Sequence, residues 1–477
     1  MDTLSALKSG QLAGSRELKL SDGLSEFPLE ILELADSLEI LDLSNNHFST
    51  LPKAFAQLKK LKIVFLNSNK FEVFPSVLAE CPALSMLSFK GNNLRAIGDD
   101  TLSPVVRWLI LTNNQIRSLP ADIGRLSKLQ KLMLAGNQLT VLPDEMAACQ
   151  NLELIRLSAN KLQTLPDWLF SLPKLSWLAY AGNPCCEMIA SVEKRERARS
   201  LPTIPDADLE IGPLLGQGAS GIIYKGLWTA TKTATETADA TPENTRTEKP
   251  TDVAVKLFKG EITSDGSPLD EMQACIAAGH HPNLVTVLGQ LSDRPGLVFS
   301  FISPDYTNLG RPPSLESCTR DTYPPETQFT LATVLQIARG IASAAAHLHA
   351  RGIMHGDLYA HNILVAPSGD SILGDFGAAS FYDPAEATTA QALEQPLERL
   401  EVRAFGCLLE DLLGHCYIKQ GDPAEAVMMS YFRQLQQMCM QAKPLARPLF
   451  SDICEALSAA LDKDLFMSVS VNASMNV

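Results

Sequence analysis

Two carboxylates and one amide in the C-terminal half of the chain have the types and spacing that phosphoryl transfer requires. Asp357 is followed five residues later by Asn362, and thirteen residues further on by Asp375 in an Asp-Phe-Gly tripeptide. One carboxylate can orient an attacking hydroxyl, while an amide and a second carboxylate can hold metal ions on nucleotide phosphates. Because an isolated Asp-Phe-Gly more often marks a turn, the segments upstream must decide whether this chemistry is present.

A glycine-rich segment precedes this group in the chain. Gly216, Gly218 and Gly221 form a G-x-G-x-x-G pattern, which dinucleotide-binding folds also contain. Here the pattern is followed by Ile223 and Tyr224 in strand-like apolar sequence rather than by a helix. The segment is therefore predicted to be a glycine-rich hairpin that covers phosphates.

A lysine follows the glycine-rich segment at the end of an apolar run. Lys256 closes the sequence Val-Ala-Val-Lys, where a buried charge needs a partner, and phosphate oxygens with a nearby carboxylate would supply one. Glu271 lies fifteen residues later, within a helical stretch that runs to His281-Pro282. We therefore expect Lys256 and Glu271 to act at the same site.

The first part of the chain repeats itself every 22 or 23 residues. One copy places its apolar residues, Asn and Pro at Leu38, Leu41, Leu43, Asn46, Phe48, Leu51 and Pro52. Further copies begin at Leu61, Leu84, Val106, Leu129, Leu152 and Leu175, and an irregular copy at Leu18 is a candidate cap. The pattern resembles the leucine-rich repeat, L-x-x-L-x-L-x-x-N-x-L. Each copy is expected to form one short strand, with the Asn bonded to backbone groups at the turn.

The residues between the buried leucines of each strand are expected to face the concave surface of the array. They are largely apolar: Ile63, Phe65, Met86, Trp108, Ile110, Met133, Leu154 and Trp177, rimmed by Lys62, Arg107, Lys131 and Arg156. A large apolar surface of this kind predicts a site for a protein substrate or regulator, with Phe65, Met86, Trp108, Ile110, Met133 and Trp177 as its contacts. The alternative is that these side chains only pack on one another across neighbouring strands.

Composition limits the classes of function that remain. The 477 residues are 45% hydrophobic with a net charge of −14, which predicts several domains and argues against nucleic-acid binding through a basic face. The ten cysteines have no C-x-x-C spacing, so neither a zinc ribbon nor a disulfide framework is expected. The most apolar long window, 331–350, is interrupted by polar residues. We therefore expect a soluble, cytoplasmic protein with no membrane span.

Taken in order, these motifs give roughly residues 207 to 460 a resemblance to the eukaryotic-type protein kinase domain. The resemblance implies ATP and Mg²⁺ as cofactors, with Asp357, Lys256 and Glu271 as catalytic residues and Asn362 and Asp375 as metal ligands. It further implies nucleotide contacts from Leu215, Gly216, Gly218, Gly221, Ile223, Ala254, Lys256, Ser300, Ile302 and Leu364.

The sequence also departs from that family. Gly356 replaces the Arg that docks a phosphate on the activation loop, and Tyr359 replaces the Lys with which serine/threonine kinases touch the transferred phosphate. The Ala-Pro-Glu tripeptide is absent, although Glu394 could pair with Arg447. Glu401 stands where the family has an Asp that braces the catalytic loop, which corresponds here to the segment from His355 to Asn362. A switch that depends on loop phosphorylation is therefore not expected.

The predicted fold class is an α/β leucine-rich-repeat solenoid followed by a two-lobed α+β protein kinase domain. The solenoid is assigned to 1–185 with about eight repeats, a linker to 186–206, the kinase domain to 207–465 and a tail to 466–477. Within the kinase domain we expect a disordered insertion at 229–252, a hinge at Ser300-Phe301-Ile302 and a further insertion after the hinge at 303–329.

The favoured function is that of an ATP-dependent serine/threonine kinase whose repeats recruit a protein. Two alternatives remain. One is a pseudokinase scaffold that acts through its repeats. The other is a kinase-like small-molecule phosphotransferase, because that group also uses His-Gly-Asp-x-x-x-x-Asn.

Overall fold

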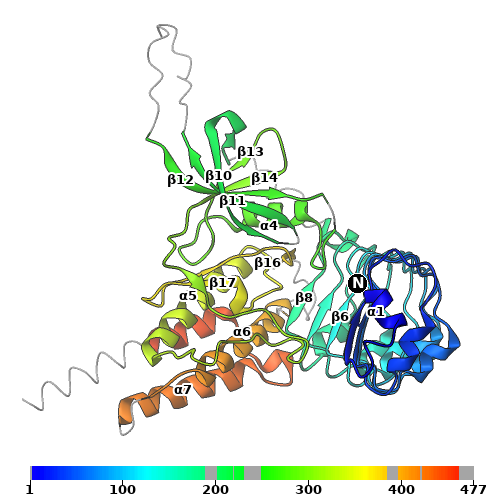
Figure 1. The fold of residues 1–477 in the computed structure, drawn as a ribbon. Helices are drawn as coiled ribbons and strands as arrows, with labels where there is room; N and C mark the ends of the chain where they lie inside the picture. Colours follow the sequence, from blue (N-terminus) through cyan, green and yellow to red (C-terminus); the bar gives the residue numbers. More distant parts are fainter. Residues whose placement is uncertain are drawn as a thin grey trace, which may run out of the picture.

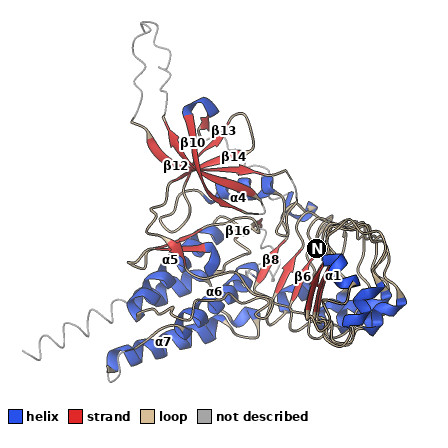
Figure 2. Ribbon diagram, viewed as in Figure 1, coloured by secondary structure: helices blue, strands red, loops and turns tan. Residues whose placement is uncertain are grey.

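The chain folds into two parts that lie side by side (Figure 1). The computed structural model describes residues 3–187, 201–218, 220–229, 249–260, 262–383, 396–418 and 422–460. The first part, blue to cyan, is a curved stack of repeats. The second part, green to red, has a small lobe built on a sheet and a large lobe built on helices, as the secondary-structure colouring shows (Figure 2). This arrangement confirms the predicted fold class.

The repeats form one parallel sheet of eight three-residue strands in sequence order. The strands are β1 Glu17–Lys19, β2 Ile40–Asp42, β3 Ile63–Phe65, β4 Met86–Ser88, β5 Trp108–Ile110, β6 Lys131–Met133, β7 Leu154–Arg156 and β8 Trp177–Ala179. Short 3-10 turns return the chain on the other side: η1 Leu29–Leu34, η2 Lys53–Gln57, η3 Ser76–Glu80, η4 Ala121–Arg125, η5 Asp144–Ala148 and η6 Asp167–Ser171. Helix α1 (Thr3–Lys8) precedes the array and α2 (Pro184–Glu187) follows it.

A ladder of buried asparagines joins each repeat to the one before it. In the case of Asn137, the side-chain amide donates to the carbonyls of Leu111 and Leu134 at 2.9 Å each, and its oxygen accepts the N–H of Ile116 at 3.0 Å. The other members are Asn46, Asn69, Asn92, Asn114, Asn160 and Asn183. The ladder satisfies backbone groups at every turn that would otherwise be buried without partners.

Replacement of one ladder asparagine tests this account. Asn137→Ala leaves one buried N–H and two buried carbonyls with fewer partners, so we expect the free energy of unfolding to fall by about 2 kcal/mol or more. Urea unfolding of the full chain, followed by circular dichroism, measures the change. Asn93→Ala, at an exposed position two repeats earlier, is the control and should leave the midpoint nearly unchanged. Equal midpoints for both variants would contradict the proposed role.

The small lobe is a six-stranded sheet with one helix. Its strand order is β10-β11-β12-β14-β13-β9. The bounds are β9 Thr203–Ile204, β10 Leu209–Gln217, β11 Gly221–Trp228, β12 Thr251–Phe258, β13 Val287–Leu291 and β14 Gly296–Ser300, with helix α4 at Pro268–Ala278.

Two predicted boundaries in this region are corrected by the strands. Thr203 and Ile204, expected in the linker, pair in parallel with β13, and Thr251 and Asp252, expected in the insertion, begin β12. Residues 230–248 of that insertion and residues 188–200 of the linker lie outside the described part of the chain.

The large lobe is built on helices α5 (Leu331–His349), α6 (Pro396–Gly414) and α7 (Pro423–Cys439), with a further helix over 450–460. Its short strands are β15 Thr307–Asn308, β16 Ile353–Met354, β17 Ile363–Val365, β18 Ser371–Leu373 and β19 Ser380–Phe381. Among the described residues, α5 alone has the length and apolar composition of a membrane-crossing helix. Most of its apolar window is buried inside the large lobe.

The last repeats share a hydrophobic core with the large lobe. Met133, Leu154 and Trp177 belong to the same buried cluster as the apolar faces of α5 and α6. In the other direction, Met354 and Leu400 of the large lobe are buried among the repeat leucines. Because buried apolar clusters of this kind hold single domains together, the two parts form one packed unit.

The predicted partner surface is divided by this packing. Met133 and Trp177 are covered by the chain's own large lobe and are not open to a separate protein in this structure. Met86 is also buried, while Phe65 and Trp108 are half-buried. Ile110 is half-buried too and packs against the core of the large lobe. The apolar character of the far end of the concave face is therefore explained by packing within one chain.

Candidate active site

A cleft of about 600 Å³ lies between the small and large lobes. Most of the residues predicted to act on a nucleotide line it: Leu215, Gly218, Gly221, Ile223, Ala254, Lys256, Glu271, Ser300, Ile302, Asn362, Leu364 and Asp375. Gly216 and Asp357 are not part of this lining. Aliphatic side chains on both walls suit a flat aromatic base, and the charged groups gather at the inner end.

The glycine-rich hairpin covers one side of the cleft. Strands β10 and β11 pair antiparallel, and the N–H of Gly218 donates to the carbonyl of Gly221 at 2.9 Å to close the tip. A Cβ added at Gly221 would lie 2.7 Å from the carbonyl oxygen of Leu257, whereas one at Gly216 or Gly218 would meet no atom within 4 Å. Gly221 is thus required by packing, and the other two glycines leave the backbone open to a ligand.

Lys256 and Glu271 form a buried ion pair at the inner end of the cleft. β12 supplies the lysine and the first turn of α4 supplies the glutamate, in a helix whose N-terminus is capped by Ser267. Burial lowers the pKa of Lys256, but the carboxylates of Glu271 and Asp375 outweigh it and raise the pKa overall. The lysine therefore stays charged, as a phosphate contact requires.

Asn362 and Asp375 present oxygen atoms on the large-lobe side of the cleft. Both bonds of the Asn362 amide nitrogen go to Asp357, at 3.0 Å to the carbonyl and 2.7 Å to Oδ2, which leaves the amide oxygen for a metal ion. Asp375 is exposed to the cleft and adopts a φ of +55°. An amide oxygen and a carboxylate are ligands that Mg²⁺ prefers, so the residues present fit this ion.

The residues that flank these ligands are tightly packed. Phe376 is buried with its ring 5.2 Å from the ring of His355, centroid to centroid. Glu401 accepts the backbone N–H groups of His355 at 3.1 Å and Gly356 at 2.6 Å, and pairs with His349. Burial raises the pKa of Glu401, but these bonds outweigh it and the pKa is lowered. A charged Glu401 therefore braces the catalytic loop.

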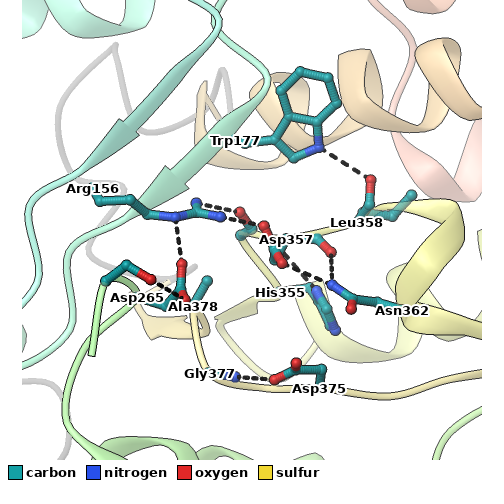
Figure 3. Close-up of polar contacts among 12 residues, drawn as sticks. Arg156, Trp177, Asp265, His355, Asp357, Leu358, Asn362, Asp375, Gly377 and Ala378 are labelled. Carbon is teal, nitrogen blue, oxygen red and sulfur yellow. Dashed lines mark hydrogen bonds and ion pairs between the residues drawn. The ribbon is translucent and has the colours of Figure 1, made fainter. Parts of the chain in front are cut away.

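Asp357 points one carboxylate oxygen toward the repeat array and the other toward Asn362, which lines the cleft (Figure 3). Its Oδ1 forms an ion pair with Arg156 at the end of β7. The same guanidinium donates to the carbonyl of Gly356 at 2.9 Å and to Oδ1 of Asp265 at 2.8 Å. One arginine of the repeats therefore contacts the catalytic loop and the small lobe at once.

Comparison with known proteins adds the family relationships. A family model described as protein tyrosine and serine/threonine kinase matches residues 209–400. Leucine-rich-repeat models match residues 37–58, 82–139 and 127–184. The chain joins leucine-rich repeats to a protein kinase domain.

The relatives include proteins named as kinases and a growth factor receptor. A probable LIM domain-containing serine/threonine-protein kinase of Dictyostelium discoideum is 25% identical over 282 residues, which cover 52% of this chain and 26% of the relative. Fibroblast growth factor receptor 1 of Xenopus laevis is 26% identical over 259 residues, 45% of this chain and 31% of the receptor. Human cyclin-dependent kinase 11A is 31% identical over 150 residues, 30% of this chain and 18% of that kinase. The chain thus spans well under half of each relative.

The two family departures in the catalytic loop lie against the repeats. Gly356 has a φ of +74°, and a Cβ there would lie 2.5 Å from the carbonyl oxygen of Leu178 and 2.6 Å from that of Ala378. Tyr359 stacks on Trp177, with ring centroids 4.3 Å apart and planes 7° apart, and burial raises its pKa well above the usual value. Gly356 leaves no room for a side chain, and a lysine at position 359 would be buried beneath Trp177, because the kinase domain is packed against strand β8.

Arg447 also donates a hydrogen bond to the repeats. Its predicted partner, Glu394, lies outside the described residues. The described bonds of Arg447 run to the carbonyls of Gln441 at 2.9 Å, Arg399 at 3.0 Å and Pro173 at 2.9 Å. A backbone carbonyl from the seventh repeat is thus one of the acceptors for the family's late arginine.

Several residues of the interface are parts of the site that the sequence does not predict. The repeat pattern predicts Arg156 only as a cation at the rim of the concave face, and no catalytic motif contains Asp265 or Tyr180. The N–H of Tyr180 donates to the hydroxyl of the buried Ser380 at 2.9 Å, and its own hydroxyl donates to the carbonyl of Phe381 at 3.3 Å. In the sequence, the unusual residues Gly356 and Tyr359 are the signals that another element compensates for the missing arginine and lysine of the family.

Gly356→Ala tests the closeness of this packing. The added methyl group would meet two carbonyl oxygens in a backbone conformation that favours glycine, so we expect the free energy of unfolding to fall by about 2 kcal/mol or more. Thermal unfolding of the full chain, followed by circular dichroism, measures the loss. The matched control is Gly414→Ala, where the added Cβ meets no atom within 4 Å. A Gly356 variant as stable as the control would show that strand β8 does not press on the loop.

Proposed function

We propose that the chain is an ATP- and magnesium-dependent protein kinase that phosphorylates serine or threonine hydroxyls. The observation that carries the proposal is the joint arrangement at one cleft of the Lys256–Glu271 pair and the oxygens of Asn362 and Asp375. Kinases need the lysine–glutamate pair and the metal-binding aspartate in position together. The burial of Phe376 against His355 supports the same assembled state.

Each group would have a distinct role in the transfer. The glycine hairpin and Lys256 would hold the phosphates, while Glu271 keeps the lysine in place. Asn362 and Asp375 would hold Mg²⁺, which neutralises the charge that develops on the phosphate oxygens. Asp357 would accept a hydrogen bond from the acceptor hydroxyl and orient it for attack.

The choice of serine or threonine over tyrosine hydroxyls is a separate part of the proposal. Relatives named as serine/threonine kinases include the Dictyostelium protein, whereas fibroblast growth factor receptor 1 carries a related domain. Tyr359 occupies the position at which serine/threonine kinases place a lysine. Phosphoamino-acid analysis of the product distinguishes serine or threonine from tyrosine.

A small-molecule phosphotransferase is the second candidate. The observation in its favour is the cover that the repeats place over Asp357, because this leaves less surface on which an extended protein segment could lie. Incubation of the full chain with labelled ATP and Mg²⁺, with and without a generic protein substrate, compares the two. Labelled protein supports the kinase, while nucleotide consumption without labelled protein supports the second candidate. Nucleotide binding without consumption would support the pseudokinase scaffold.

Recruitment through the repeats belongs to the same proposal. Leucine-rich repeats generally bind proteins, and Phe65 and Trp108 remain partly accessible on the concave face. A cytoplasmic location is consistent with the ten cysteines, all of which are free thiols. The assay with labelled ATP is independent of the protein partner and of the cytoplasmic location.

Three substitutions test the assignment of catalytic roles. We expect Lys256→Ala, Asp357→Ala and Asp375→Ala each to lower kcat by roughly a hundredfold or more, because each removes a charge that contacts phosphate, hydroxyl or metal. Steady-state kinetics of the full chain measure the effect, and circular dichroism checks the fold. Near-normal turnover in a folded Asp357 variant would contradict the assigned role.

Loop phosphorylation should not be needed for activity. Gly356 has no side chain to dock a phosphate, and Ser380 is buried with its hydroxyl bonded to Tyr180. We therefore expect Thr388→Ala with Thr389→Ala to change the rate less than about twofold. Initial rates of dephosphorylated wild-type and variant proteins provide the comparison. A loss that aspartate substitutions restore would reveal another phosphate-docking cation.

A further inference from the structure

Arg156 is a buried cation in the middle of the interface between the repeats and the catalytic loop. Its side chain is 2% exposed, while those of its partners Asp265 and Asp357 are 30% and 16% exposed. Strand β7 carries it, and the neighbouring strands place Met133 and Ala179 at the same register position. The array therefore presents a single arginine at this level of its concave face, directed at the catalytic loop (Figure 3).

The charge of Arg156 is balanced by the two carboxylates. Burial alone would lower its pKa, but Asp357 and Asp265 outweigh this and raise the pKa, so the guanidinium stays protonated. Asp357 is fixed from two sides, by Arg156 at Oδ1 and by the Asn362 amide at Oδ2. Each carboxylate oxygen has a second acceptor site, and the side chain keeps some exposure, so a hydroxyl can still bind to it.

Asp265 extends the connection to the small lobe. It lies between β12 and α4, three residues before the first residue of the helix that carries Glu271. The adjacent Gly266 is also in close contact with the repeats, since a Cβ there would lie 3.1 Å from Cβ of Ser158. Arg156 thus connects the segment just before α4 with the loop that carries Asp357.

We propose that Arg156 is a positioning residue of the kinase active site, supplied by the repeats, which fixes Asp357 and α4 together. Arg156 contacts the catalytic loop at a place where two cations of the family are missing. Gly356 replaces the family's loop arginine, and Tyr359 replaces its lysine. Asp265 provides the negative charge that a phosphorylated activation loop provides elsewhere. The inference deepens the proposed kinase function and rests on it.

The packing around Arg156 favours a permanent role over an inhibitory cover. An inhibitory cover has to come away from the site, yet Met354 and Leu400 are buried in the repeat core. Trp177 stacks on Tyr359 and donates to the carbonyl of Leu358 at 3.1 Å. The Lys256–Glu271 pair, which inactive kinases often lack, is formed while Arg156 is docked.

The experiment compares full-length Arg156→Gln, Arg156→Lys and Asp265→Asn with the wild type. The probes are Mg²⁺·ATP and a generic protein substrate, and the readouts are kcat, KM for ATP and the Kd for Mg²⁺·ATP. We expect Arg156→Gln to lower kcat by about tenfold to a hundredfold, with KM and Kd for ATP changed less than about threefold. Arg156→Lys should recover part of kcat, because it restores the charge but not the forked geometry.

Asp265→Asn guards against a fold defect in the buried arginine variants. Its side chain is partly exposed, so this variant should fold, and we expect its kcat to fall in the same direction as that of Arg156→Gln. Arg95→Gln, an exposed arginine of an earlier repeat paired only with the exposed Glu72 in the ion pairs described, is the control and should match the wild type.

The possible results separate this inference from the proposed function. Turnover in Arg156→Gln equal to or above the wild type would overturn the positioning role, and a gain would identify an inhibitory contact. Activity in Arg156→Gln alone, with an inactive wild type, would overturn the inference and keep the kinase function. If the wild type and all its variants bind Mg²⁺·ATP but none transfers phosphate, both the positioning role and the proposed kinase function would be overturned.

Discussion

A fully buried guanidinium between two carboxylates is the constraint on which the arrangement of the two parts depends. Arg156 cannot be left without its partners, because an uncompensated buried charge destabilises a protein by about 3–5 kcal/mol. Its contacts join strand β7, which carries it, to two other segments: the residues just before α4 and the catalytic loop. Those segments must therefore keep their relative positions whenever the arginine is in place.

The regularity of the repeats makes this constraint effective. Each strand pairs in parallel with the next in an unbroken register, and the asparagine ladder fixes the turns. A side chain on such a rigid element is held more accurately than one on a loop. The kinase domain packs equally tightly on the repeats. Gly356 leaves no space for a Cβ, and the ring of Tyr359 stacks on that of Trp177.

Much of the fold was predictable because it depends on local patterns. The 23-residue period fixes the strands and the ladder, and the order of the glycine loop, Lys256 and Asp375 fixes the kinase domain. The position of Arg156 was not predictable in the same way. It lies 201 residues from Asp357 in the sequence, and periodicity says which face a residue occupies but not what covers that face. For the same reason, the pattern alone predicts Met133 and Trp177 as contacts for another protein, whereas the large lobe of the same chain covers them.

The asparagine ladder also has a consequence for the order in which the chain folds. Its bonds join residues about one repeat apart, such as Asn137 and Leu111, which are separated by 26 positions. Repeats of this kind can form one after another as they leave the ribosome. The catalytic loop is synthesised after the repeats, so the repeat surface that it contacts can already be folded. The solenoid would thus act as a template for the nascent kinase domain, and a rearranged gene with the kinase domain first would lack that template during synthesis.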